Sequence, residues 1–228
     1  MPSDVVTVNY NAGEFLSGCV ASALAQGVCS VIVVDNASVD DSLALLEQSC
    51  PDESRLKILR NAANLGFAAA CNIGMHASNQ PFVLFLNPDA TLAPDALARM
   101  MEALVSTEEA GMAGGLLCNP DGSEQPGGRR IFPTPARAFM RAFGLSRIAG
   151  RFPGMFPDFL LHNAPLPAAP VAVEAISGAC MLVKRAAMED VGLWDEGYFL
   201  HCEDLDWCMR FHQKGWQQAC SMLGCCWA

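Results

Sequence analysis

Short apolar runs that close on a polar residue alternate with helical patterns along the first half of this chain. Residues 31–35 (VIVVD) and 82–89 (FVLFLNPD) are two such runs, and they end on Asp35 and Asp89. Runs of this length are typical of buried strands, and segments with helical periodicity such as 15–26 separate them. Alternating strands and helices form parallel sheets. The predicted fold class is therefore α/β, with a Rossmann-like, mostly parallel central sheet and helices on both faces.

The composition of the chain changes in its second half. Residues 119–170 contain nine of the fourteen prolines, and residues 129–151 contain six arginines and no acidic residue. Strand and helix patterns resume after this stretch. We predict three regions, at 1–118, at 119–170 (a variable Pro/Arg-rich excursion) and at 171–228, with an atypical end from about 217.

Composition excludes several classes of function. The net charge of -10 disfavours a nucleic-acid-binding protein. The apolar runs are too short to span a bilayer, and the start lacks a signal-peptide pattern, so we expect a cytoplasmic protein. Eleven cysteines without framework spacing disfavour a disulfide scaffold. Histidines and cysteines crowd the C-terminus, but they lack the spacing of a structural zinc site.

Polar residues follow three predicted strands where each strand ends. They are the loop at 9–11 (NYN), Asp35 and Asp89. In an open α/β sheet, ligands bind beyond the carboxyl ends of the strands, so these residues form a site hypothesis. Each aspartate has a simpler alternative as a turn residue. Otherwise Asp35 can accept the imide N–H of a pyrimidine, and Asp89 can ligate a divalent cation that also holds a diphosphate.

Three acidic residues, Glu203, Asp204 and Asp206, occur in the first turn of a predicted helix. Acids at this position suit the helix dipole, which is one explanation for them. Neighbouring aromatic residues favour another, because a carboxylate beside aromatics can act as a general base. The segment 64–74 (NLGFAAACNIG) likewise allows two interpretations. Gly66 either supplies a strand-to-helix turn, or the small residues let a ligand approach the backbone.

Five segments of the chain carry a family resemblance, in this order: TVNYN, VDNASVDDS, NLGFAAACNIG, LFLNPDA and SGACMLVKRAAMEDVGLWDEGYFLHCEDLDWCMR. They resemble glycosyltransferase family two, in its bacterial rhamnosyltransferase-like branch. The resemblance extends from Val5 to about Trp216. It implies that 1–118 is a nucleotide-sugar-binding half, that 119–170 is an acceptor-side excursion and that 171–228 is an acceptor and catalytic half. It also implies a GT-A fold and an Mg²⁺ or Mn²⁺ ion. The implied reaction is the inverting transfer of a sugar, with rhamnose suggested, from a nucleoside-diphosphate sugar to a hydroxyl of a cell-surface glycan or lipid-linked acceptor.

The resemblance also assigns roles to residues. Asp204, paired with Glu203, corresponds to the catalytic base, and Asp89 corresponds to the metal ligand. The residues predicted to bind the donor are Val8, Asn9, Tyr10, Asn11, Asp35, Asn36, Asn64, Gly66, Asn72 and Asn87. Asn87 stands where many relatives have an aspartate. The residues predicted to bind the acceptor are Trp194, Tyr198 and Trp207.

The final residues, QQACSMLGCCWA, differ from the family, whose members continue through a further strand to a histidine. We therefore expect a chain truncated at the C-terminus, and a catalytically impaired nucleotide-sugar-binding remnant is the alternative function. A nucleotidyltransferase or a nicotinamide dehydrogenase needs a glycine-rich loop after the first strand. Residues 9–15 (NYNAGEF) contain one glycine and no cation, which disfavours both.

The arginine-rich stretch at 129–152 carries interleaved apolar residues. Such a segment can lie on an anionic membrane surface or hold a lipid pyrophosphate, which predicts peripheral membrane contact at the inner face of the membrane. The alternative is a solvated loop whose arginines pair with the acidic body of the protein.

Overall fold

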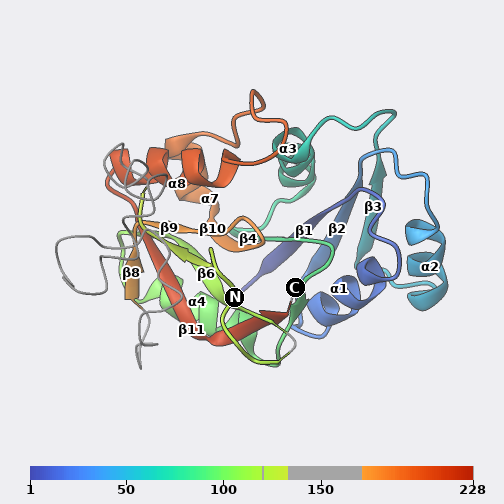
Figure 1. Cartoon of the computed structure of the whole chain (residues 1–228), viewed down its shortest axis with the longest axis horizontal. Helices are drawn as coiled ribbons and strands as arrows, with labels where there is room; N and C mark the ends of the chain where they lie inside the picture. The colour runs from blue at the N-terminus through green and yellow to red at the C-terminus, as the bar shows by residue number, and fades with distance from the viewer. Residues whose placement is uncertain (120, 133–170, 228) are drawn as a thin grey trace, which may run out of the picture.

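The computed structural model describes residues 1–119, 121–132 and 171–227, and only the backbone of residues 221–227. Its helices and strands follow in chain order (Figure 1). They are β1 (Ser3–Asn9), α1 (Phe15–Leu24), β2 (Ser30–Asp35), α2 (Ser42–Ser49), β3 (Leu56–Arg60), α3 (Phe67–Ala77), β4 (Phe82–Leu86), β5 (Thr91–Leu92), α4 (Ala96–Val105), β6 (Ala110–Cys118), β7 (Arg129–Arg130), β8 (Val171–Val173), β9 (Ala175–Ile176), β10 (Cys180–Lys184), α7 (Arg185–Val191), α8 (Glu203–Gln213) and β11 (Gln217–Trp227).

The described residues form one large mixed sheet with the strand order β3-β2-β1-β4-β10-β6-β11-β5. The four strands β3, β2, β1 and β4 run parallel, because a helix returns the chain to the same edge after each of them. Strand β10 lies antiparallel between β4 and β6, and β11 runs parallel to β6. The predicted α/β class with a mostly parallel sheet is confirmed.

Helices cover both faces of the sheet, as predicted (Figure 1). Side chains alternate between the two faces along each strand. In β1, Val5 packs in the cluster with α1, α2 and α4, whereas Val6 packs in the cluster with α3, α7 and α8. β2 alternates in the same way. All six of its residues are buried, as expected for a strand covered on both faces.

The sheet crosses the predicted boundary between residues 1–118 and 171–228. Strand β10 comes from the second of these regions and is inserted between β4 and β6 of the first. The two regions therefore share one core. The predicted excursion at 119–170 lies mostly outside the described residues.

The atypical end of the chain also joins the sheet. Residues 217–227 form β11, which pairs with β6 along its length and with β8 and β5 on its other side. The register shifts between Ser221 and Cys225, which marks a bulge in this strand. The backbone of this ending is thus part of the fold.

A two-residue ladder joins residues 129–130, within the predicted excursion, to residues 175–176, just after it. In β7, Arg129 pairs with Ile176 of β9, and Arg130 pairs with Ala175. The backbone N–H of Phe132 also donates to Oε2 of Glu174 at 2.6 Å. These contacts hold residues 129–132 against residues 174–176.

None of the helices in the described part of the chain is both long enough and apolar enough to cross a bilayer.

Candidate active site

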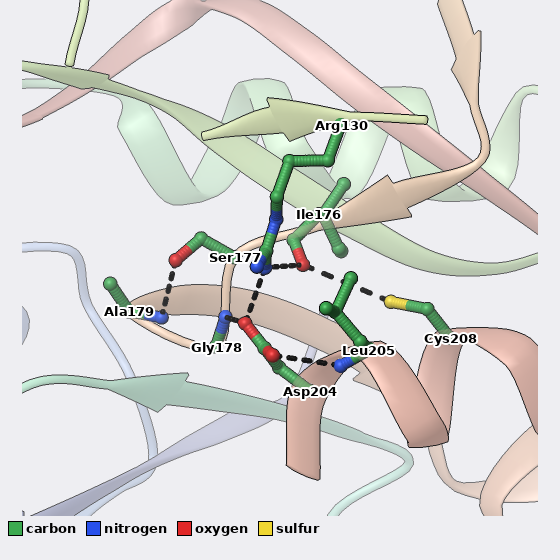
Figure 2. A network of polar contacts seen from close by, with 8 residues as sticks. All are labelled: Arg130, Ile176, Ser177, Gly178, Ala179, Asp204, Leu205 and Cys208. Carbon is green, nitrogen blue, oxygen red and sulfur yellow. Dashed lines mark hydrogen bonds and ion pairs between the residues drawn. The ribbon is translucent and has the colours of Figure 1, made fainter. Parts of the chain in front are cut away.

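The first turn of α8 holds the Asp204 carboxylate in a fixed network (Figure 2). Oδ2 accepts a hydrogen bond from the backbone N–H of Gly178 at 3.1 Å and forms an ion pair with Arg130. Oδ1 accepts from the backbone N–H of Leu205 at 2.7 Å. The side chains of Asp204 and Arg130 are each 15% exposed. The carboxylate is thus oriented by three donors and still has an edge open to solvent.

The turn at 177–179 links Asp204 to the end of β4. Strand β10 begins opposite the last residue of β4, where Cys180 pairs with Leu86. Beyond this pair, the backbone N–H of Asn87 donates to the carbonyl oxygen of Ala179 at 2.9 Å. Residues 87–89 therefore lie beside the turn whose Gly178 amide contacts Asp204. The predicted base and the predicted metal-binding turn are on the same edge of the sheet.

Asp35 lies farther along the same edge of the sheet. It is the last residue of β2, and its backbone pairs in register with Asn9, the last residue of β1. Its Oδ1 accepts from Nδ2 of Asn9 at 2.8 Å, and its Oδ2 accepts from the backbone N–H of Ser38 at 3.2 Å. Asp35 is only 4% exposed. The carboxylate is consequently held in one orientation at the end of the strand.

Hydrogen bonds at and beside Gly66 join the loop after β3 to the loop before α8. The side chain of Asn36 donates to the Gly66 carbonyl at 3.1 Å, and Asn64 accepts from the Gly66 N–H at 3.0 Å. The next amide, that of Phe67, donates to the Phe199 carbonyl at 2.9 Å. Gly66, Asn36 and Asn64 therefore shape the loop itself, which agrees with the turn interpretation of this segment.

Replacing Gly66 with alanine is expected to destabilise the fold by about 2 kcal/mol. Gly66 has φ +86°, and an added Cβ would lie 2.7 Å from the carbonyl oxygen of Phe199. Gly215 is a matched control, because it has φ +87° and no atom within 4 Å of a Cβ. Urea unfolding measures both variants. Equal losses of stability would show that the contact with Phe199 is unimportant.

Two residues predicted to bind the acceptor lie in the core. Trp207 is 0% exposed and Trp194 is 3% exposed, and their ring centroids are 4.2 Å apart. Trp207 also stacks edge-on against Phe85 and donates through Nε1 to the Gly192 carbonyl at 2.9 Å. Because so little of these rings reaches solvent, the structure gives the two tryptophans a packing role, and their predicted acceptor contact stays a prediction. Tyr198 is half-buried and keeps access to solvent.

Three residues predicted to bind the donor are also buried. Nδ2 of Asn72 donates to the carbonyl oxygen of Trp194 at 3.0 Å, and Oδ1 of Asn72 accepts from the backbone N–H of Trp194 at 3.1 Å. Asn9 directs Nδ2 toward Asp35 and toward the hydroxyl of Ser42 at 2.8 Å. Val8 packs in the core. These three side chains are packed beneath the exposed Tyr10 and Asn11 or engaged with other residues, and their predicted donor contact stays a prediction.

Glu203, the other predicted catalytic acid, is 8% exposed. Its Oε2 is buried and has no hydrogen-bond partner among the described residues. Burial raises the pKa of Glu203, and the charge of Asp204 acts in the same direction. The buried position makes Glu203 less accessible to a substrate than Asp204.

The described residues alone supply too few metal ligands for a divalent cation, so a bound substrate would have to contribute the others. Asp89 is exposed in the turn after β4, and no group of three or more His, Cys, Asp or Glu side chains in the described ranges could hold a metal ion. Mg²⁺ in nucleotide sites is often bound by one or two carboxylates together with substrate phosphates. The exposed Asp89 is compatible with that arrangement.

Arg130 is a site residue that the sequence analysis missed. It was grouped with the six arginines of the predicted membrane segment, but its guanidinium contacts Asp204 and the carbonyl oxygen of Ile176, the latter at 2.9 Å. Arg129 is also internal and pairs with Glu124 at 2.7 Å. These two arginines therefore do not face a membrane. The rest of the predicted segment, residues 133–152, lies outside the described residues.

Open α/β sheets bind their ligands beyond the carboxyl ends of the strands, which is where Asp35 and residues 87–89 lie in this protein. The sequence model described as "Glycosyl transferase family 2" matches residues 4–162. The chain is also 31% identical to "N-acetylglucosaminyl-diphospho-decaprenol L-rhamnosyltransferase" of Mycobacterium tuberculosis, over 93% of this chain and 71% of that protein. This chain belongs to glycosyl transferase family 2.

Solved structures share the fold. "Crystal structure of GalNAc-T7 with UDP, GalNAc and Mn2+" superposes with a TM-score of 0.72 at 17% identity, over 100% of this chain and 43% of that one. The "Mannosyltransferase PcManGT from Pyrobaculum calidifontis in complex with GDP-Man and Mn2+" gives 0.67 at 16% identity, over 99% and 56%. The chain thus spans about half the length of these two proteins. The predicted GT-A fold is confirmed.

Proposed function

We propose that this protein is an inverting glycosyltransferase that uses a nucleoside-diphosphate sugar as donor and a hydroxyl as acceptor. The observation that carries the proposal is the position of Asp204, which is joined through the turn at 177–179 to residues 87–89 at the end of β4. Such a transfer requires a base for the acceptor hydroxyl and a group that binds the departing diphosphate. Asp204 and the turn at 87–89, on the same edge of the sheet, are proposed to supply them.

Asp35 is proposed to recognise the nucleotide base. Its carboxylate is held by Asn9 and Ser38 at the end of β2, so it need not reorganise when a base binds. The exposed Tyr10 and Asn11 lie on the loop that follows the paired strand β1 and are proposed to line the same pocket. Both uridine and thymidine present an imide N–H that a carboxylate can accept.

Asp204 is proposed to be the general base. It takes the proton from the acceptor hydroxyl while the hydroxyl oxygen forms a bond to the anomeric carbon. The bond between that carbon and the diphosphate oxygen breaks in the same step, and the diphosphate leaves with the bonding electron pair. A Mg²⁺ or Mn²⁺ ion held by Asp89 would supply positive charge to the departing diphosphate. Attack opposite the leaving group inverts the anomeric centre.

The acceptor is proposed to be a cell-surface glycan or a lipid-linked intermediate, and the sugar to be rhamnose. The support is the similarity to the mycobacterial rhamnosyltransferase, whose name gives a diphospho-decaprenol acceptor. Of the predicted acceptor residues, the half-buried Tyr198 remains available for this contact. A lipid-linked acceptor would place the reaction at the cytoplasmic face of a membrane.

The function is tested by the release of nucleoside diphosphate from a panel of nucleotide sugars, with and without a hydroxyl acceptor. Acceptor-dependent release is the expected result. A thermal shift with donor but no release with any acceptor would favour the donor-binding remnant. Absence of both would contradict the proposal.

Asp89→Asn is expected to weaken metal-promoted donor binding by at least about tenfold, because the site has few other protein ligands. The measurement is donor affinity titrated with Mn²⁺ and without it. Asp95→Asn is the matched control, since Asp95 is an exposed aspartate in the next turn of the chain, ahead of α4. If Asp89→Asn and Asp95→Asn both retain the full Mn²⁺ effect, Asp89 is not the metal ligand.

A further inference from the structure

We propose that Arg130 is the positioning residue for Asp204, and that it fixes Oδ2 so that Oδ1 is the atom that takes the acceptor proton. This inference rests on the proposed function, because it specifies which atom of the base reacts. Figure 2 shows the arrangement, with Arg130 approaching from β7 and Asp204 from the start of α8.

The hydrogen bonds distinguish the two carboxylate oxygens. Each oxygen of an ionised carboxylate has two lone-pair directions. Oδ2 receives two donors, the guanidinium of Arg130 and the backbone N–H of Gly178. Oδ1 receives only the backbone N–H of Leu205. One lone pair therefore remains on Oδ1, and this is where a substrate hydroxyl can donate its hydrogen.

Arg130 can hold this orientation because it is itself held. Its backbone lies in the ladder between β7 and β9, opposite Ala175. The nitrogen that contacts Asp204 also donates to the Ile176 carbonyl at 2.9 Å. The guanidinium is mostly shielded from water, at 15% exposure, so its charge-assisted bond to Asp204 is weakly screened.

Arg130 differs from the other two donors to Asp204. The Gly178 amide is on a turn and the Leu205 amide is adjacent in sequence, and neither carries a charge. The guanidinium comes from 74 positions away in the chain and defines a single direction. Removal of Arg130 should therefore misplace the base without disturbing the edge of the sheet near Asp35.

The first test compares Arg130→Ala and Arg130→Lys. We expect Arg130→Ala to lower kcat about 100-fold, the loss typical of a base displaced by about 1 Å, while donor affinity changes less than about twofold. Lysine supplies a cation without the planar fork, so Arg130→Lys should restore about tenfold of the loss. The matched control is Arg210→Ala, which removes a guanidinium from Asp206 on the same helix, and it should leave kcat within about twofold.

A double mutant separates positioning from a general structural effect. If Arg130 acts through Asp204, then Arg130→Ala should lower the residual rate of Asp204→Asn by less than about twofold. Equal losses in both backgrounds would overturn the inference and leave the proposed function intact. Arg130→Ala with an unchanged kcat would overturn it as well.

A structural measurement covers the case in which the parent protein shows no transfer. In a crystal structure of Arg130→Ala, or of Arg130→Lys if the first variant does not fold, the Asp204 side chain should rotate away from the Gly178 amide. An Asp204 side chain that keeps its position without the guanidinium would overturn the positioning role. Failure of transfer by the parent protein contradicts the proposed function separately.

Discussion

Replacing Asp204 with asparagine is expected to lower the rate of sugar transfer by about a thousandfold, the typical contribution of a positioned general base. The amide keeps the shape of the carboxylate but cannot take the acceptor proton. Donor affinity should stay within about twofold, because Asp35 and residues 87–89 are unchanged. The measurements are acceptor-dependent release of nucleoside diphosphate and thermal shift with donor.

The same substitution has a second consequence that must be controlled. It removes the counter-charge of Arg130, whose side chain is 15% exposed and whose Nε is buried without a partner among the described residues. We expect a loss of about 1–3 kcal/mol in the free energy of unfolding. Asp206→Asn breaks the more exposed pair with Arg210 and should affect neither stability nor rate strongly. A full rate in Asp204→Asn would show that another group is the base.

Replacing Trp207 with alanine is expected to lower the free energy of unfolding by about 3–5 kcal/mol, as for other buried aromatic residues. The indole is completely buried, contacts three aromatic rings, those of Phe85, Trp194 and Phe211, and donates a hydrogen bond to Gly192. Urea unfolding monitored by far-UV circular dichroism measures the loss. Trp207→Phe keeps most of the ring packing and should cost less than half as much.

This prediction decides between the two roles considered for Trp207. A packing role lowers stability and leaves the KM for the acceptor unchanged in any fraction that folds. A role in acceptor binding would raise this KM in Trp207→Phe while stability stays close to that of the parent protein. The second outcome would contradict the burial of Trp207 described above.

The fold was predictable where the signal is local. Strand β2 could be found from its apolar run, and Asp35 could be placed at a sheet edge because parallel strands end together. The insertion of β10 between β4 and β6 depends on pairing between strands far apart in the chain, and local periodicity contains no information about it. For the same reason, the contact between Arg130 and Asp204 was not predicted.

The prediction for the tryptophans rests on a different kind of pattern. Helical spacing places Trp207 and Phe211 on one face of α8, and this pattern predicts a core face as readily as a sugar-binding face. Glu203 and Asp204 precede Trp207 by four and three positions, so these acidic residues lie on the same side of the helix and do not separate the two interpretations. The burial of Trp207 favours the packing role, and the Trp207→Phe measurement tests it.

The clasp formed by β7, β9 and the bond between Phe132 and Glu174 has a consequence for how relatives can diverge. Because the clasp holds both ends of the intervening chain, the length of that chain can change without moving Arg130. Relatives can therefore differ in the length and sequence of the stretch at 133–170 and still keep the contact between Arg130 and Asp204.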